Sequence, residues 1–254
     1  IMIRRPPRST LARPRRQRQM CIRDRSNSFK LLPGPLFADV VLVDEINRTG
    51  PKTQSSLLQA MEEGVITLDR KTYELPKDFF LLASQNPFDF EGVYPLPESQ
   101  LDRFLLRLQI GYAEVETEMD VLRHYDMPGG GHLDHHVKLN TLSEGLLSSA
   151  RQQVSAVHVS EGLYRYVAEI AKASRSEPRL SLGLSTRGAL ALMRCARVEA
   201  ACRGRDDVVP DEVKGIATHI TAHRLVLTPE ASLVGIYCVQ VYNDIAARVP
   251  APRD

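Results

Sequence analysis

Several features that define large classes of protein are missing from this chain of 254 residues. It has no tryptophan and only 6% aromatic residues, which argues against nucleobase stacking as its main mode of binding. No apolar run approaches the roughly 18 residues that suggest a transmembrane helix. Its four cysteines form no C-x-x-C pair, so nothing indicates an oxidising compartment. We therefore predict a globular protein of the cytoplasm that does not span a membrane.

The positive charge is concentrated at the N-terminus. Residues 1–25 contain nine Arg and one Asp, a net charge of +8, so the rest of the chain carries −6 against the total of +2. A nucleic-acid partner would depend on those 25 residues alone. The acidic remainder of the chain argues against such a partner.

The basic tail, residues 1–26, shows no helix or strand period and contains three Pro, so we predict that it is disordered. Its strings IMIRRPPRSTL and RQRQMCIRDR resemble translated sequencing-adapter sequence. We favour an artefact over a basic arm for nucleic acid or anionic lipid, and we leave the tail out of the fold prediction.

An apolar run at residues 40–43 leads directly into the carboxylates of Asp44 and Glu45. Four consecutive β-favouring residues predict a strand that is buried on both faces of a parallel sheet. Ligands bind outside the carboxyl ends of such strands. There one acid can hold a hydrated Mg²⁺ and the next can polarise a water molecule. The alternative role for such a pair is a helix N-cap.

The pattern continues as an α/β succession. We predict a helix at residues 53–64, a hairpin at 65–75 and a second buried strand at 79–83. That strand ends in a polar turn at the same edge of the sheet, where Asn86 could orient an attacking water. The alternative for Asn86 is a turn residue that precedes Pro. Residues 105–110 predict a third strand.

The second half of the chain has the pattern of a helical domain. Ser160, Ser185 and Pro210 each precede or begin an amphipathic segment, and residues 141–144 form a capping-box pattern before another.

Between a predicted helix at residues 114–126 and the capping-box pattern at 141–144 lies a glycine-rich stretch with His132, His135 and His136. Together with Asp134 these imidazoles could bind Zn²⁺ or Ni²⁺. The stretch contains no Cys and no second ligand pair, so we favour a solvated loop.

Taken together, three segments resemble the MoxR family of AAA+ ATPases: VLVDEINRTGPKTQSSLLQAMEEGVITLDRKTYELP, LLASQNPFDFEGVYPLPESQLDRFLL and GLSTRGALALMRCAR. The resemblance extends from about residue 27 to about residue 227. It implies an α/β fold class, in which a partial AAA+ parallel-sheet nucleotide-binding core at residues 27–111 is followed by an all-α helical lid at residues 112–248.

The resemblance also implies roles for five residues. Asp44 matches the Walker B aspartate that holds Mg²⁺ through water, and Glu45 matches the catalytic glutamate that activates the hydrolytic water. Asn86 matches sensor 1, which positions that water. Arg103, in LDRF, matches the arginine finger that reaches the neighbouring subunit's ATP. Arg187, in LSTRG, matches sensor 2 on the lid. The implied cofactors are ATP and Mg²⁺.

For the whole protein, the family implies a homo-oligomeric ring, expected to be a hexamer, that hydrolyses ATP. Hydrolysis would remodel client proteins or insert cofactors into them, with a von Willebrand A-type partner. The alternative is a non-catalytic fragment that acts only as an assembly partner. The chain departs from the family pattern because it contains no GxxxxGK[ST] phosphate-binding loop, the Walker A motif. We expect that the sequence is truncated at its N-terminus and that this chain as given is inactive.

The missing loop leads to a first prediction. Without backbone N–H groups to cradle the phosphates, Asp44 and Arg187 have no anchored triphosphate to act on. Chain 1–254 should therefore show no saturable ATP binding in isothermal titration calorimetry. Micromolar affinity, about −8 kcal/mol, would contradict this expectation.

Overall fold

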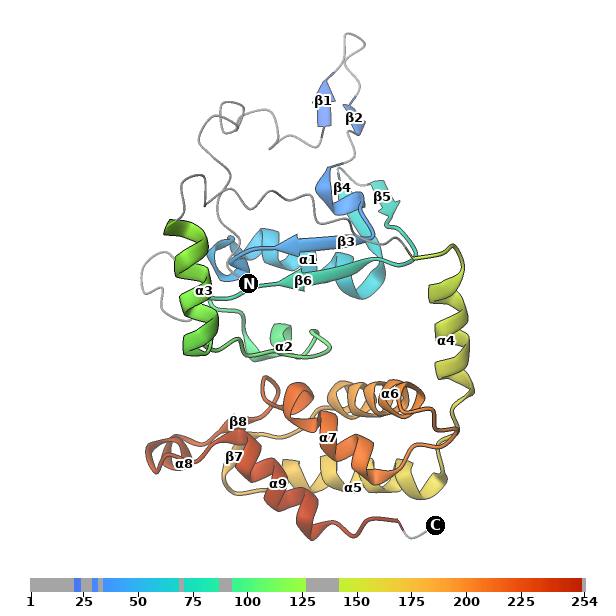
Figure 1. Ribbon diagram of the computed structural model, residues 1–254, viewed down its shortest axis with the longest axis vertical. Helices are drawn as coiled ribbons and strands as arrows, with labels where there is room; N and C mark the ends of the chain where they lie inside the picture. The colour runs from blue at the N-terminus through green and yellow to red at the C-terminus, as the bar shows by residue number, and fades with distance from the viewer. Residues whose placement is uncertain are drawn as a thin grey trace. The chain divides into compact units, whose positions relative to one another are not determined.

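The computed structural model divides the chain into two compact units, Ile1–Arg103 and Phe104–Asp254. Figure 1 colours the chain from blue at the N-terminus to red at the C-terminus. The structure describes residues 21–23, 29–31, 34–68, 71–86, 93–126 and 142–252.

Two parallel strands form the centre of the first unit. Strand β3 (Val40–Val43) pairs with β6 (Phe80–Ala83), and their arrows point the same way in Figure 1. Val43 lies opposite Ala83, so both strands end level with each other. Parallel neighbours need a crossover connection, which a helix and a hairpin provide here. The predicted parallel sheet is confirmed.

The crossover follows the predicted pattern closely. Helix α1 (Pro51–Glu63) ends where Gly64 takes a left-handed conformation with φ of 66°, which glycine adopts without steric cost. Ala60 of α1 is fully buried together with Ile66 and Leu75 from the following hairpin. The other elements of this unit are the paired β4 (Val65–Leu68) and β5 (Lys71–Glu74), the paired β1 (Cys21–Arg23) and β2 (Phe29–Leu31), the short 3₁₀ helices η2 (Pro35–Phe37) and η3 (Ile46–Arg48), and α2 (Glu98–Leu101).

Two predictions for this unit need correction. Strands β3 and β6 are each buried on one face only. In β3, Val41 is 7% exposed and Val40 60% exposed; in β6, Leu81 is 8% exposed and Phe80 52% exposed. Successive side chains of a strand point to opposite faces, and the described elements cover only one face of the β3–β6 pair. The tail at residues 1–26 was predicted to be disordered, but Cys21–Arg23 forms a strand. Residues 1–20 lie outside the described part of the chain.

The boundary between the units lies eight residues before the predicted one, because the chain after Arg103 is bound by the second unit. The guanidinium of Arg224 donates to the carbonyls of Phe104 and Leu105, and the backbone N–H of Arg107 donates to the carbonyl of His219 at 2.8 Å. These bonds hold the segment against the end of a helix. The predicted strand at residues 105–110 is therefore wrong, since no described strand pairs with it.

The second unit is a helical bundle, as predicted, with one short antiparallel strand pair that the sequence did not indicate. Ser160 accepts a hydrogen bond from the backbone of Leu163 at 3.3 Å, and Ser185 accepts one from Gly188 at 2.9 Å. Both predicted N-caps are thereby confirmed. The elements are α3 (Val115–Asp126), α4 (Leu146–Ala156), α5 (Glu161–Arg175), β7 (Leu180–Leu182), α6 (Thr186–Cys202), α7 (Pro210–Thr221), β8 (Val226–Leu227), α8 (Pro229–Leu233) and α9 (Cys238–Arg248).

Helices α5, α6, α7 and α9 share one apolar core, in which Leu163, Leu192, Ile220 and Val241 are completely buried. The N-cap of α4 is Gly145, with no side-chain hydrogen bond, and not a residue of the capping box predicted at 141–144. Glycine at this position leaves the cap without an acceptor side chain, and residue 141 is outside the described part.

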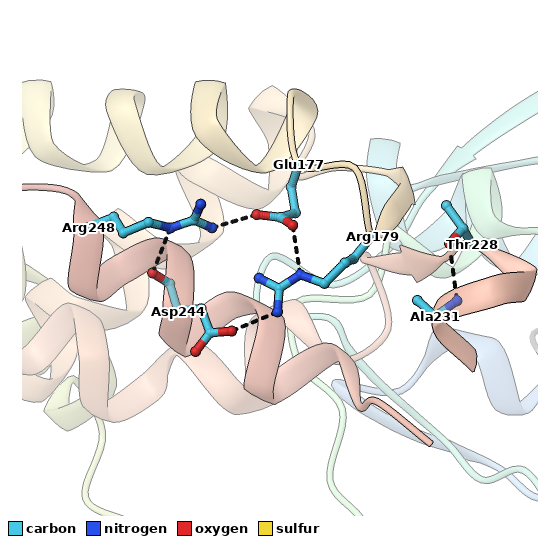
Figure 2. Close-up of polar contacts among 6 residues, drawn as sticks. All are labelled: Glu177, Arg179, Thr228, Ala231, Asp244 and Arg248. Carbon is cyan, nitrogen blue, oxygen red and sulfur yellow. Dashed lines mark hydrogen bonds and ion pairs between the residues drawn. The ribbon is translucent and has the colours of Figure 1, made fainter. Parts of the chain in front are cut away.

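A network of ion pairs connects the loop after α5 to α9, as Figure 2 shows. The carboxylate of Glu177 accepts hydrogen bonds from Arg179 at 2.7 Å and from Arg248. Arg179 also donates to Asp244 at 2.7 Å. Only 8% of Glu177 is exposed. The hydrogen bond from Arg179, together with that from Arg248, lowers the pKa of Glu177 from 4.5 to about 2.

The buried position of Glu177 makes its pairing testable. At pH 7, Glu177→Gln should lower the free energy of unfolding by about 1–3 kcal/mol, because two guanidinium groups lose a charged partner. The pKa of Glu177 is lower in the folded than in the unfolded chain, so its contribution is complete above about pH 4.5 and is lost as pH falls toward 2.

Urea unfolding at several pH values should therefore show the gap between wild type and Glu177→Gln shrinking over that range. Asp244→Asn is the matched control, because the Asp244 side chain is 56% exposed and its ion pair contributes little. Equal losses in the two variants would refute the role of Glu177.

Candidate functional site at the ends of two parallel strands

The candidate site begins where β3 and β6 end together. The backbone N–H of Ser84 donates to the carbonyl of Val43 at 2.9 Å, and the N–H of Ile46 donates to the carbonyl of Ser84 at 3.0 Å. These bonds continue the pairing one step beyond the strands. Asp44 and Glu45 lie between the two bonded positions, so the carboxylates follow the sheet's carboxyl edge, as predicted.

The side chain of Ser84 joins both carboxylate residues. Its hydroxyl donates to Oδ1 of Asp44 at 2.6 Å and accepts the backbone N–H of Glu45 at 2.8 Å. A hydrogen bond of hydroxyl to carboxylate is a strong, charge-assisted one. The side chain of the residue that follows β6 thus fixes the turn after β3.

Glu45 has an unusual backbone. Its φ of 51° and ψ of 57° place it in the left-handed region, and it is the one non-glycine residue with positive φ in the described part of the chain. Such a conformation costs an L-residue about 1–2 kcal/mol, and strain of this kind concentrates at functional sites. The carboxylate of Glu45 pairs with Nε of Arg48 at 3.2 Å.

Asn86 lies two residues beyond Ser84 at the same edge. Its carbonyl accepts a hydrogen bond from the side-chain amide of Asn47 at 3.2 Å. Asn47 is only 6% exposed, and its Oδ1 has no hydrogen-bond partner among the described residues. An unsatisfied buried acceptor favours a bound water molecule or another donor at this place.

Gln54 of α1 stabilises the turn after β3 by hydrogen bonds to the backbone. Its buried side-chain amide donates to the carbonyls of Ile46 at 3.3 Å and Tyr94 at 2.9 Å. The backbone N–H of Tyr94 in turn donates to the carbonyl of Asn47 at 2.7 Å. The turn after β3, helix α1 and the segment before α2 are thereby locked together.

Arg103 stands apart from this cluster. Its guanidinium pairs with Glu62 near the C-terminal end of α1. Gln54, beside the carboxylates, and Glu62 are eight positions apart, which is about 12 Å along a helix. Both side chains of the Arg103–Glu62 pair are 36% exposed.

Arg187 belongs to the second unit, in the first turn of α6, where it is exposed. The next residue, Gly188, lies so close to Arg224 that a Cβ would approach its Cδ to 2.8 Å. The absence of a side chain there leaves room for the guanidinium that holds Phe104 and Leu105.

The oxygen donors at the end of β3 fit Mg²⁺, one of the two implied cofactors. Carboxylate oxygens at a strand end suit Mg²⁺, which usually keeps several waters and binds through one or two carboxylates. The residues that would cradle phosphates are not in this sequence. Among the described residues, no three His, Cys, Asp or Glu side chains cluster to hold a metal directly, and the cluster of His132, His135 and His136 lies outside that part.

Three residues of this site were missed by the sequence analysis: Ser84, Asn47 and Gln54. The position of Ser84 at the end of the second predicted strand could have singled it out, since polar residues at carboxyl ends of parallel strands face ligands. Asn47 and Gln54 carry no such signal, because their burial depends on the tertiary fold.

Comparison with known proteins agrees with this geometry. The family model described as ATPase family associated with various cellular activities (AAA) matches residues 18–106, and the AAA lid domain matches residues 172–237. A crystal structure of a Cytophaga hutchinsonii protein assigned as an ATPase superposes with a TM-score of 0.78 at 32% identity, covering 92% of this chain and 72% of that one.

Two relatives are similar over most of this chain. YeaC of Bacillus subtilis is 41% identical over 224 residues, which are 88% of this chain and 69% of that protein. Chaperone MoxR1 of Mycobacterium tuberculosis is 35% identical over 229 residues, which are 87% of this chain and 59% of that protein. The chain belongs to the AAA+ ATPases of the MoxR type, with the expected α/β core and helical lid.

In the stretches that the structure describes, no helix combines the length and apolar character of a membrane span.

The strained backbone of Glu45 gives a prediction that separates strain from chemistry. Glu45→Gly and Glu45→Ala both remove the carboxylate, but only glycine removes the steric cost of positive φ. Glu45→Gly should therefore be more stable than Glu45→Ala by about 1 kcal/mol in urea unfolding. Equal stability, or a more stable alanine variant, would show that Glu45 is not held in the left-handed region in solution.

Proposed function

We propose that this chain carries the water-activating part of a MoxR-type ATPase site, with ATP as substrate and Mg²⁺ as its metal. The observation that supports this most strongly is the joining of Asp44 and Glu45 to the end of β6 through one hydroxyl, that of Ser84. Two carboxylates fixed at a sheet's carboxyl edge suit metal-assisted hydrolysis of a phosphoanhydride.

In this proposal each residue has one task. Asp44 holds the metal through a water molecule, and Mg²⁺ when bound supplies positive charge against the phosphate oxygens. Glu45 accepts a proton from the attacking water. Asn86 orients that water with its side-chain amide. Arg103 stabilises charge at a neighbouring subunit's γ-phosphate, and Arg187 contacts the nucleotide from the lid.

The whole protein would work as a homo-oligomeric ring in the cytoplasm, a hexamer in our proposal. Its hydrolysis cycle would remodel client proteins or insert cofactors into them, together with a von Willebrand A-type partner. The relative named Chaperone MoxR1 supports the chaperone-like part of this proposal. The second candidate is a non-catalytic assembly partner, and the test below distinguishes the two.

The in-trans role of Arg103 is supported by the position of its partner along α1. Arg103 pairs with Glu62, which lies about 12 Å along the helix from Gln54, the residue of α1 that bonds to the turn after β3. An arginine finger that acts on a neighbour does not need to reach its own site.

The test uses an extended form, in which an AAA+ segment with a GxxxxGK[ST] loop is joined ahead of this chain. Glu45→Gln should abolish turnover and keep ATP binding, because the amide preserves shape but accepts no proton. Arg103→Ala should fold, bind ATP and lose about 10³–10⁵ in rate.

Mixing the two inactive variants should restore some hydrolysis, because a mixed ring contains sites where an intact Glu45 faces an intact Arg103. Hydrolysis and subunit exchange are measured in parallel. If mixed rings form and no activity returns, Arg103 does not act in trans. If the extended wild type binds ATP and hydrolyses none, the assembly-partner candidate is the correct one.

A further inference from the structure

The hydroxyl of Ser84 donates one hydrogen bond and accepts another. A hydroxyl has one proton to donate, and here it goes to Asp44 at 2.6 Å. The oxygen's lone pairs remain to accept the N–H of Glu45 at 2.8 Å. Each bond favours the other, because donation to a carboxylate increases the negative charge on the oxygen that accepts. The two neighbouring residues are therefore coupled through a single atom.

The bond to Glu45 falls where the backbone is strained. Glu45 keeps φ of 51° although it carries a Cβ, and a strained residue persists only where its surroundings hold it there. On one side, the backbone of Ser84 pairs with Val43 and Ile46. The remaining constraint on the N–H of Glu45 is the Ser84 hydroxyl. This conformation sets the direction in which the Glu45 side chain leaves the turn.

We propose that Ser84 is a positioning residue of the ATPase site, which holds the metal-binding carboxylate and the catalytic glutamate in a fixed mutual orientation. The inference rests on the proposed function of Asp44 and Glu45. Ser84 acts through these two residues and contacts neither nucleotide nor metal in this scheme. A misplacement of about 1 Å in a reacting group costs about a hundredfold in rate, so a bridging hydroxyl of this kind controls kcat.

The effect of the hydroxyl can be separated from that of side-chain shape by comparing two variants of nearly equal shape. Threonine keeps the donor and acceptor and suits a strand end, whereas valine has the same shape without the hydroxyl. Ser84→Thr and Ser84→Val are thus a matched pair. Ser56 is the control: it is exposed on α1 and its hydroxyl donates to the carbonyl of Lys52, so Ser56→Ala removes a hydroxyl elsewhere in the same unit.

The first experiment uses chain 1–254 and does not depend on ATP. Heteronuclear NMR reports the amide shift, the amide exchange rate and the φ of Glu45. In Ser84→Val the Glu45 amide should exchange about tenfold faster, and its φ should leave the left-handed region. Ser84→Thr and Ser56→Ala should match wild type. If Glu45 keeps its amide shift, exchange rate and φ in Ser84→Val, the proposal is overturned.

The second experiment measures steady-state ATP hydrolysis by the extended form. Ser84→Val should lower kcat by about tenfold to a hundredfold while KM for ATP stays within about twofold, and Ser84→Thr should restore kcat. An unchanged kcat in Ser84→Val, a rise in KM alone, or a threonine variant that behaves like valine would each overturn the proposal. An extended wild type that hydrolyses no ATP refutes the proposed function instead, and the NMR result still decides what Ser84 does.

Discussion

The hydrogen-bonded connection between the ends of β3 and β6 organises the candidate site. Because the strands run parallel and in register, Val43 and Ala83 lie opposite each other and the residues after them meet at one edge. Ser84 then bonds to the backbone on both sides of the Asp44–Glu45 pair and, through its hydroxyl, to both of these residues. A strand shift of one residue would turn each side chain to the other face and separate these groups.

Support for this edge comes from buried polar groups as well as from the apolar core. Gln54 and Asn47 connect the turn after β3 to α1 and to the segment around Tyr94. In a low-dielectric interior such bonds are costly to leave unmade, so each partner fixes the next. The second unit is built differently, from a large apolar core of four helices and a network of ion pairs around the buried carboxylate of Glu177.

The sequence predicted those elements whose signals are local. The positions of β3 and β6, the helix α1 and the serine caps of α5 and α6 depend on neighbouring residues, and all were located correctly. Prediction failed where tertiary contacts decide the outcome. Residues 105–110 have strand-like composition, yet their backbone bonds to the helical unit. Arg224 donates to the carbonyl of Leu105, and the N–H of Arg107 donates to a carbonyl of α7.

For the candidate site, Asp44, Glu45 and Asn86 could be located from the strand ends, and family resemblance supplied Arg103 and Arg187. The role of Ser84 could not be derived from spacing, because it depends on the exact pairing of two strands 40 residues apart. The left-handed conformation of Glu45 could not be predicted either, since glutamate has no preference for it. Both features emerge only when the register of the sheet is known.

The central claim is that Asp44 and Glu45 act together on a Mg²⁺-bound nucleotide. The most direct measurement is a structure of the extended form with Mg²⁺ and a non-hydrolysable ATP analogue. Our account predicts a metal-bound water against Asp44, a second water between Glu45 and the γ-phosphate, and Arg103 of a neighbouring subunit at that phosphate. A nucleotide bound away from the end of β3, with no ordered water at Glu45, would contradict it.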